Sequence, residues 1–345
     1  MRILLGLSGG VDSTYAAKKL IDEGNEVEAA VVLMHEFTSV SEAAESAASL
    51  GIPLHVIDAR EKFSDIVKSN FVNEYLNART PNPCIICNSE VKFIALHDFA
   101  IKNGFDKIAT GHYASVVKLE DECSVRYTLM RGKDAKKDQT YMLWRLPQKI
   151  LSDLVLPLSD KLKEEIRAVC READLAAADR GDSQEICFIP GGDYSDFIES
   201  VAGKSEHGKF LDEEGNILGT HRGIIRYTVG QRRGLGISAE TRLFVKNIDP
   251  ASNTVVISKN DPVFNKVFID GVVYSGIDRI EDGKELYLSV KLRYAAKPKL
   301  AKVKFFGDTA EIELLETERA VTPGQSAVLY DGDLLVAGGF ISMAE

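Results

Sequence analysis

The stretch that decides the fold is Arg2-Ile3-Leu4-Leu5-Gly6-Leu7-Ser8-Gly9-Gly10-Val11-Asp12-Ser13. It opens with an apolar run of strand length, and the apolar residues of 14–20 recur with helical spacing. A buried strand that enters a helix through a Ser/Gly turn places free backbone N–H groups at the helix N-terminus. That geometry binds an anion, above all phosphate. Asp12 or Ser13 is the expected N-cap of the helix.

The spacing of this turn excludes two better-known phosphate loops. No Lys-Ser/Thr pair follows the glycines, and the glycines do not fit G-x-G-x-x-G. What remains is S-G-G-V-D-S, with hydroxyls at both ends and a carboxylate, Asp12, that could hold Mg²⁺ against a pyrophosphate. It resembles the pyrophosphate loop of the N-type ATP pyrophosphatases, which split ATP into AMP and pyrophosphate while adenylating a substrate. The alternative is a strand–helix turn that binds no ligand. This alternative is weaker because six residues match the motif directly after a strand.

Length and composition describe an ordinary soluble protein. The chain has 345 residues, enough for two or three domains, with 45% hydrophobic and 27% charged residues. No apolar run approaches the roughly 20 residues of a membrane span, and the first residues lack a signal-peptide core. We therefore expect a cytoplasmic protein with no membrane partner. The net charge of −10 argues against nucleic-acid binding over the whole surface but leaves room for local basic patches.

The order of expected elements predicts an α/β fold followed by β-domains. Strands and helices alternate over residues 1–110, which is typical of a doubly wound parallel sheet, and residues 115–130 read as an extended hairpin. Ligands of such sheets bind beyond the carboxyl ends of the strands, where residues 8–13 would lie. Helical patterns disappear after residue 200. We expect a catalytic domain at 1–200, a small central β-domain at 201–262 and a C-terminal β-barrel at 263–345.

Five cysteines in a long chain without a signal peptide suggest reactive, metal-binding or core thiols rather than a disulfide framework. They are Cys84, Cys87, Cys123, Cys170 and Cys187. Two of them lie in a loop that two prolines stiffen, at residues 79–88. We expect the next helix to begin near Asn88, so that its dipole favours the thiolate of Cys87. Cys123 and Cys170 are expected to be ordinary residues.

A set of motifs in fixed order carries a closer resemblance. They are the loop 8–13, Met34, T-P-N-P-x-x-x-C-N at 80–88, A-T-G-H-Y at 109–113, K-D-Q at 137–139, S-Q-E-I-C-F at 183–188 and G-Q-R-x-G-L at 230–235. Over essentially its whole length the chain resembles the tRNA-specific 2-thiouridylases, or tRNA-uridine 2-sulfurtransferases. The resemblance implies an adenine nucleotide hydrolase-like domain, two β-barrels and ATP-dependent 2-thiolation of the wobble uridine, position 34, of tRNA.

The resemblance also implies roles for individual residues. Catalysis would use Asp12, Cys187 as the persulfide carrier, and Cys87 as the second thiol. ATP would bind Gly6, Leu7, Ser8, Gly9, Gly10, Val11, Asp12, Ser13, Met34 and Gly111. The anticodon loop of tRNA would contact Asn82, Pro83, Cys84, His112, Lys137, Asp138, Gln139, Arg293, Tyr294 and Gln325. A cysteine desulfurase or a sulfur-relay protein would supply the sulfur.

One departure from the family pattern leaves the sulfur chemistry open. Many members carry Asp where this chain has Cys84. The three thiols of Cys84, Cys87 and Cys187 could hold a [4Fe–4S] cluster with one open iron, on which a sulfide would replace the persulfide as donor. A closed structural zinc is less favoured because it would leave no thiol for chemistry. A second departure, the absence of a long acidic insertion after Met34, affects only the adenosine contacts.

Other charged segments have simpler explanations. The helix expected at 160–171 has mixed charges and is predicted to be merely exposed. The basic cluster of Arg222, Arg226, Arg232 and Arg233 lies in a Gly-rich loop, which favours phosphate contact. Two competing functions remain at this stage. One is an ATP-pyrophosphatase ligase for a small metabolite, which would need no pair of thiols, and the other is a non-catalytic RNA-binding adaptor.

Overall fold

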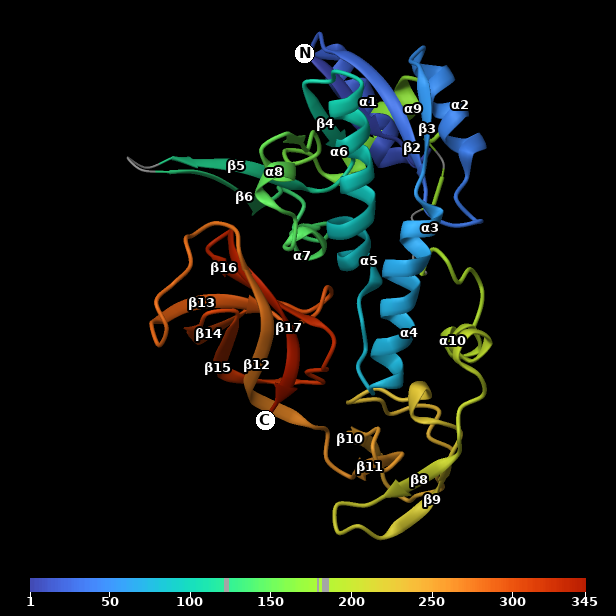
Figure 1. Ribbon diagram of the computed structural model, residues 1–345, viewed down its shortest axis with the longest axis vertical. Coiled ribbons are helices and arrows are strands. Elements are labelled where there is room, and N and C mark those ends of the chain that lie inside the picture. Colours follow the sequence, from blue (N-terminus) through green and yellow to red (C-terminus); the bar gives the residue numbers. More distant parts are fainter. Residues whose placement is uncertain (121–123, 179, 182–185) are drawn as a thin grey trace.

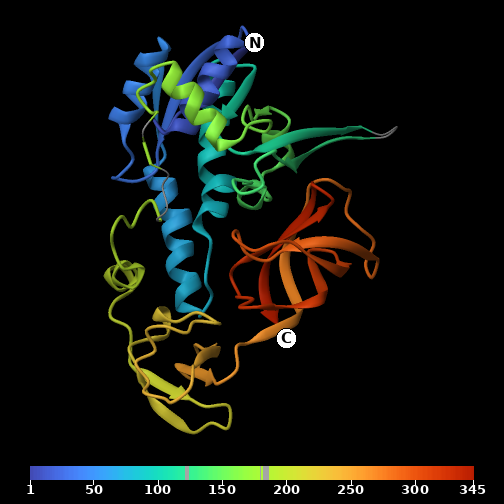
Figure 2. The same cartoon turned by 180° about the vertical axis from the view of Figure 1, so that it is seen from behind.

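A computed structural model describes residues 1–120, 124–178, 180–181 and 186–345. It divides into an α/β part, a helical column, a small β-sheet and a barrel (Figure 1). The column joins the α/β part to the small sheet, and the barrel lies beside the column (Figures 1 and 2). No helix among these residues is both long enough and apolar enough to cross a membrane.

The α/β part is built on a five-stranded parallel sheet in the order β3-β2-β1-β4-β7. Its strands are β1 (Arg2–Gly6), β2 (Glu26–Leu33), β3 (Leu54–Asp58), β4 (Lys107–Thr110) and β7 (Leu154–Val155). The order reverses between β1 and β4, so a crevice opens where their carboxyl ends diverge. The predicted parallel sheet is thus confirmed, and the loop 8–13 leaves β1 at this crevice.

Helices cover both faces of the sheet. They are α1 (Val11–Asp22), α2 (Val40–Leu50), α6 (Phe93–Lys102) and α9 (Lys163–Glu172). Successive β1 residues point to opposite faces. Ile3 and Leu5 pack with α1 and α9, whereas Leu4 packs against α6. Both faces of β1 are therefore buried, which explains its continuous apolar run.

The helical column consists of two continuous helices, each with a π-helical stretch. The first runs through α3 (Arg60–Phe63), η1 (Ser64–Lys68) and α4 (Ser69–Leu76). The second runs through α5 (Pro83–Ile86), η2 (Cys87–Lys92) and α6. The two π stretches contact each other. Single π turns inside helices are frequent at functional sites, and here one of them begins at Cys87.

The hairpin predicted at 115–130 is present as β5 (Ala114–Glu120) and β6 (Val125–Arg131), although its expected tip with Cys123 lies outside the described residues. Three further short helices lie between the hairpin and the β-structures in the described part of the chain. They are α7 (Thr140–Leu143), α8 (Gln148–Leu151) and α10 (Tyr194–Ala202).

Two β-structures follow α10. The central sheet has the order β10-β11-β8-β9 and comprises β8 (Gly208–Leu211), β9 (Ile217–His221), β10 (Phe244–Asp249) and β11 (Thr254–Ser258), with the short 3₁₀ helix η3 (Ile224–Arg226). The barrel comprises β12 (Val263–Tyr274), β13 (Glu285–Lys291), β14 (Lys299–Phe306), β15 (Thr309–Arg319), β16 (Ser326–Asp331) and β17 (Leu334–Ala344). Strand β12 pairs with both β15 and β17 and so closes the barrel.

Candidate active site

The loop after β1 is shaped by its own hydroxyls. Gly10, and neither Asp12 nor Ser13, is the N-cap of α1, and no side chain caps it, so the predicted N-cap is wrong. Ser13 is used differently: its Oγ donates to the Gly10 carbonyl at 3.1 Å and accepts from the Ser8 N–H at 3.2 Å. An uncapped first turn leaves its N–H groups to an anion in the crevice.

Two glycines let this loop pack tightly. Gly9 has φ +81°, and a Cβ there would lie 2.5 Å from the backbone of Glu42. At the end of β4, a Cβ on Gly111 would lie 2.7 Å from the Ser13 nitrogen. Any larger residue at either position would push the loop out of place.

A cavity of about 410 Å³ opens beside this loop. Its volume lies in the range that holds a small-molecule ligand. Of the residues predicted to bind ATP, the lining includes Gly6, Leu7, Ser8, Asp12, Ser13, Met34 and Gly111. Gly9, Gly10 and Val11 belong to the same loop without lining the cavity. The lining also includes Lys92, His112, Gln139 and Cys187. A larger hollow of about 620 Å³ at residues 57–62 and the α6 surface contains none of the predicted site residues.

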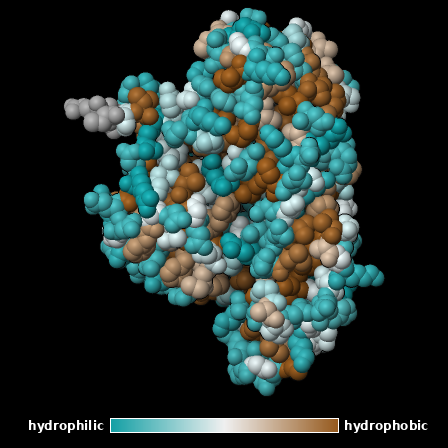
Figure 3. Space-filling view, viewed as in Figure 1, coloured by the Kyte–Doolittle hydropathy of each residue, from teal (hydrophilic) through white to brown (hydrophobic). Residues whose placement is uncertain are grey.

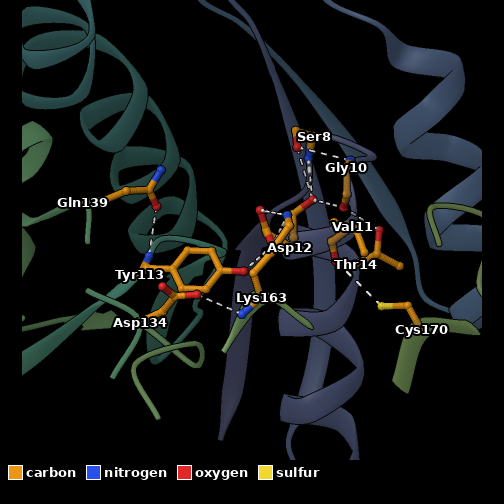
Figure 4. Close-up of polar contacts among 11 residues, drawn as sticks. Ser8, Gly10, Val11, Asp12, Thr14, Tyr113, Asp134, Gln139, Lys163 and Cys170 are labelled. Carbon is orange, nitrogen blue, oxygen red and sulfur yellow. Dashed lines mark hydrogen bonds and ion pairs between the residues drawn. The ribbon is translucent and has the colours of Figure 1, made fainter. Parts of the chain in front are cut away.

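The Asp12 carboxylate is held from two sides (Figure 4). The Nζ atom of Lys163 lies 2.7 Å from both carboxylate oxygens, and the Tyr113 hydroxyl donates to Oδ1 at 2.6 Å. Tyr113 is held in turn by Gln139, whose Oε1 accepts from the Tyr113 N–H at 2.9 Å. The helix expected to be merely exposed therefore places one buried lysine on the phosphate loop.

Neither Lys163 nor Tyr113 was predicted as a site residue. A signal for Lys163 exists in the sequence, because the buried residues of α9 are Lys163, Ile166 and Cys170. Their spacing of three and four puts the lysine on the apolar stripe of the helix. A lysine on such a stripe needs a buried partner.

His112 is neutral at physiological pH. Burial and the neighbouring Lys92 cation lower its pKa well below the ordinary value. Its Nε2 lies 3.5 Å from the Lys92 ammonium and its Nδ1 lies 2.8 Å from the Thr110 hydroxyl. Because an ammonium can only donate, Nε2 is the acceptor, and the ring proton resides on Nδ1.

Three thiols gather beside the cavity. Cys84 and Cys187 are exposed and Cys87 is buried. The charges of Cys84 and Cys187 both act on the Cys87 thiol, and Cys87 shares an apolar cluster with Ile186 and Phe188. The Cys87 Sγ also lies 3.3 Å from the Met34 sulfur. Residues a hundred positions apart in sequence are thus neighbours.

The predicted dipole effect on Cys87 is wrong. The helix begins at Pro83, with the Asn82 side chain accepting from the Cys84 N–H at 3.2 Å, so Cys87 lies a full turn inside it. Burial instead raises the pKa of Cys87 to about 12. The protein around Cys187 shields its thiol from part of the solvent and raises its pKa to about 11, although the residue is exposed. The Lys92 cation opposes both shifts.

Neither metal predicted from the sequence has a complete protein ligand set. Within residues 1–120, 124–178, 180–181 and 186–345, no group of three or more His, Cys, Asp or Glu is arranged to hold a metal ion. Mg²⁺ still fits, since it commonly binds one carboxylate together with water and substrate phosphates. An iron–sulfur cluster needs thiolates. Cys84, Cys87 and Cys187 are not arranged as such a ligand group, so the described thiols fit a cluster poorly.

Comparison with known proteins places this geometry in a family. Three family profiles match in order: the tRNA methyl transferase HUP domain at residues 1–191, the tRNA methyl transferase PRC-barrel domain at 195–259 and the aminomethyltransferase beta-barrel domain at 272–341. The tRNA-specific 2-thiouridylase MnmA of Clostridioides difficile (strain 630) is 40% identical over 99% of this chain and 98% of its own length. The enzyme of the same name from Treponema denticola is 41% identical over 100% and 99%.

The chain belongs to the tRNA-specific 2-thiouridylase family.

In this thiouridylase the cysteine loop is docked onto the barrel. The Thr80 N–H donates to the Pro323 carbonyl at 2.8 Å, and the Gln325 amide donates to the Thr80 carbonyl at 2.7 Å. The Asn82 amide reaches the Met142 sulfur at 3.3 Å. On the face drawn in Figure 3, apolar residues gather in patches along the helical column and at the upper right of the molecule.

Two residues of the K-D-Q motif of this thiouridylase, Asp138 and Gln139, make different kinds of contact. Only 3% of the Asp138 side chain is exposed, and its Oδ1 accepts from the Thr140 N–H and hydroxyl. Its Oδ2 lies 3.6 Å from the Nζ of Lys291 and 3.9 Å from the Nε of Arg131. Its neighbour Gln139 lines the cavity. Asp138 is thus placed to fix the motif to the barrel rather than to face a ligand.

Two further residues predicted to contact tRNA lie on the barrel rim. Arg293 is half-exposed and pairs with Glu318 at 3.2 Å. Tyr294 lies beside Tyr141, with 6.3 Å between ring centroids, and the Lys291 ammonium lies 5.3 Å from its ring. Burial raises the pKa of the Tyr294 hydroxyl, and Cys84 of the cysteine loop is among the nearby groups that raise it further.

Proposed function

We propose that this protein is an ATP-dependent tRNA-uridine 2-sulfurtransferase that thiolates the wobble uridine at position 34. The observation that carries the proposal is that Cys187 lines the same cavity as the loop 8–13, with Cys84 and Cys87 as its neighbours. A nucleotide bound in the cavity would leave its α-phosphate within reach of a base presented to the thiols. The relatives that match over full length carry the name of this activity.

The chemistry requires activation before sulfur transfer. A uridine C2 carbonyl is a poor electrophile, so its oxygen attacks the α-phosphorus of ATP, and pyrophosphate leaves. The loop 8–13 supplies N–H groups to the phosphates, and Asp12 is the residue that would hold Mg²⁺. When bound, that ion neutralises charge on the departing pyrophosphate. The target base reaches the pocket by leaving the anticodon stack.

Sulfur transfer then uses two thiols. The terminal sulfur of a Cys187 persulfide attacks C2 and forms the new C–S bond. The Cys87 thiolate attacks the Cys187 sulfur, which breaks the S–S bond of the persulfide and forms a Cys87–Cys187 disulfide. AMP leaves with the former C2 oxygen, and 2-thiouridine remains. A thiol reductant then reduces this disulfide and restores the two thiols, and a cysteine desulfurase or sulfur-relay protein of the cytoplasm reloads Cys187 as a persulfide.

The persulfide route is proposed over a [4Fe–4S] cluster because, among the described residues, the thiols of Cys84, Cys87 and Cys187 are not arranged as a group that could hold a metal. A C84A variant separates the two routes, since only the cluster needs the third thiol. Full activity of C84A supports the persulfide. Loss of activity in C84A, together with iron charge-transfer absorbance after anaerobic reconstitution of the wild type, supports the cluster.

The decisive test is mass spectrometry of tRNA nucleosides after incubation with ATP, Mg²⁺ and a desulfurase. We expect 2-thiouridine with the wild type and none with C187S or C87S. Pyrophosphate release that ignores added tRNA would favour the competing ligase for a small metabolite. Methylated uridine in place of 2-thiouridine would favour the methyl transfer that two of the matching profiles carry in their descriptions.

A further inference from the structure

The Asp12 carboxylate, the group placed to hold a divalent cation, already holds a cation of the protein. The Lys163 ammonium lies 2.7 Å from both of its oxygens (Figure 4). Lys163 is 7% exposed and begins α9, which packs against α1. Asp12 lines the cavity, whereas Lys163 is not among the described residues that do, so the ammonium approaches the carboxylate from outside the cavity.

The two cations compete for the same oxygens. A buried ammonium is stable only beside a compensating charge, and Asp12 provides one. A divalent ion that arrives alone would have to share or displace this partner and would face repulsion at short range. ATP changes the balance, because its phosphates bring several negative charges. These charges offer the ammonium an alternative to Asp12 and offset the repulsion.

The carboxylate keeps its position during such an exchange. The Tyr113 hydroxyl donates to Oδ1 of Asp12. Gln139 holds the backbone of Tyr113 by two hydrogen bonds: its Oε1 accepts from the Tyr113 N–H, and its own N–H donates to the Tyr113 carbonyl. This support does not involve Lys163. A shift of the ammonium therefore frees the carboxylate oxygens without releasing the carboxylate itself.

We propose that Lys163 is a placeholder cation on Asp12. It is a positioning residue that disfavours a divalent ion alone and makes metal and nucleotide bind cooperatively. The proposal rests on the proposed function only in taking ATP as the nucleotide. Couplings between two ligands of one protein typically amount to about 5- to 150-fold in affinity.

The test measures binding of Mn²⁺ by electron paramagnetic resonance, alone and with α,β-methylene ATP, an analogue that resists cleavage between the α- and β-phosphates. The wild type should bind Mn²⁺ weakly alone and at least about fivefold more tightly with the analogue. K163M should bind Mn²⁺ alone at least about fivefold more tightly than the wild type, and should lose most of the coupling. D12N should abolish both. K163R, which keeps the charge, should resemble the wild type.

Lys161 provides the matched control, because it precedes the same helix and pairs at the surface with Asp160 at 3.3 Å. K161M should behave as the wild type. Unchanged or weaker binding of Mn²⁺ alone in K163M overturns the proposal, as does absence of coupling in the wild type. If K163M fails to fold by circular dichroism, K163Q takes its place with the same expectation. None of these readouts involves tRNA or sulfur, so failure of thiolation would overturn the proposed function and leave this inference standing.

Discussion

At the scale of single residues, two opposing influences set the pKa of the two thiols proposed for catalysis: the surrounding protein raises it, and a nearby cation lowers it. Burial raises the pKa of Cys87 to about 12, partial shielding by the surrounding protein raises that of the exposed Cys187 to about 11, and Lys92 opposes both shifts. The thiolate is the nucleophile. In the free protein both thiols are therefore weak nucleophiles at neutral pH. The Lys92 cation makes this effect smaller because it favours the thiolate.

We expect alkylation of Cys187 by iodoacetamide to rise about tenfold per pH unit up to about pH 11, since below its raised pKa each unit multiplies the thiolate fraction by ten. Cys87 should react more slowly because it is buried. Replacing Lys92 with Met removes the opposing cation and should slow Cys187 by up to about tenfold, the effect of one pKa unit. Peptide mass spectrometry measures both rates.

Lys102→Met, at the far end of α6, is the control for this experiment and should leave both rates unchanged. Equal rates for K92M and the wild type at every pH would contradict the assigned role of Lys92. The same raised pKa values set a stability trend. The unfolded thiols lose protons near pH 9 and the folded ones do not, so the free energy of unfolding falls as the pH rises from about 9 towards 12.

At the scale of elements, the sequence predicts an element correctly where the periodicity of the segment itself determines which faces are buried. The unit β1–loop–α1 was predicted because a strand, a glycine turn and a helix lie within twenty residues. Three features escaped prediction: the start of α5 at Pro83, the burial of Cys87, and β12. Each depends on what packs against the segment from elsewhere in the chain. The mixed pattern of β12 reflects its pairing with both β15 and β17.

The close approach of β4 to α1 gives an element-level prediction. In Gly111→Ala the new methyl would lie 2.7 Å from the Ser13 nitrogen, so α1 or β4 must move. We expect a loss of about 1–3 kcal/mol in the free energy of unfolding, as for overpacked cores. We also expect weaker binding of the ATP analogue. Gly219→Ala, where the added methyl meets open space, should change neither quantity in denaturant titration or calorimetric binding.

At the scale of the whole molecule, distant segments are joined by buried polar contacts. The β5–β6 hairpin pairs with β17, and Asp138 contacts Lys291 of the barrel. No local pattern predicts such joints. The domain limits at 200 and 262 stay predictions for the same reason, as do the roles assigned to individual site residues.

Asp138→Asn tests the joint between the catalytic part and the barrel. The change leaves the buried Lys291 cation without its charged partner and removes one of the two carboxylates near Arg131, and we expect a loss of about 2–4 kcal/mol in the free energy of unfolding. Asp333→Asn is the control, since Asp333 also lies near Arg131, at 3.8 Å, but is 71% exposed. It should cost less than about 0.5 kcal/mol. Equal losses in the two variants would show that Asp138 does not hold the barrel.

Binding of tRNA depends on how charge is distributed over the surface. Because the chain has a net charge of −10, it must bind a polyanion through local cationic patches. The arginines of the basic loop 222–233 in the central part differ in whether they are free to contact phosphate. Arg226 is engaged by Asp193, Asp196 and Glu199 and holds α10 in place, so its predicted phosphate contact becomes the weaker interpretation. Arg222, Arg232 and Arg233 are exposed. These three are the residues of the cluster that are available to phosphates.

We therefore expect the double variant R232A/R233A to weaken tRNA binding and to lower the slope of log affinity against log salt by about two, one for each lost phosphate contact. Thermal stability should not change, because both side chains are exposed. R226A should do the reverse, with a lower melting temperature and a nearly unchanged salt slope. Filter binding at several salt concentrations measures the slope. A slope that R232A/R233A leaves unchanged would move the phosphate contacts to Arg222 or to the barrel rim around Arg293.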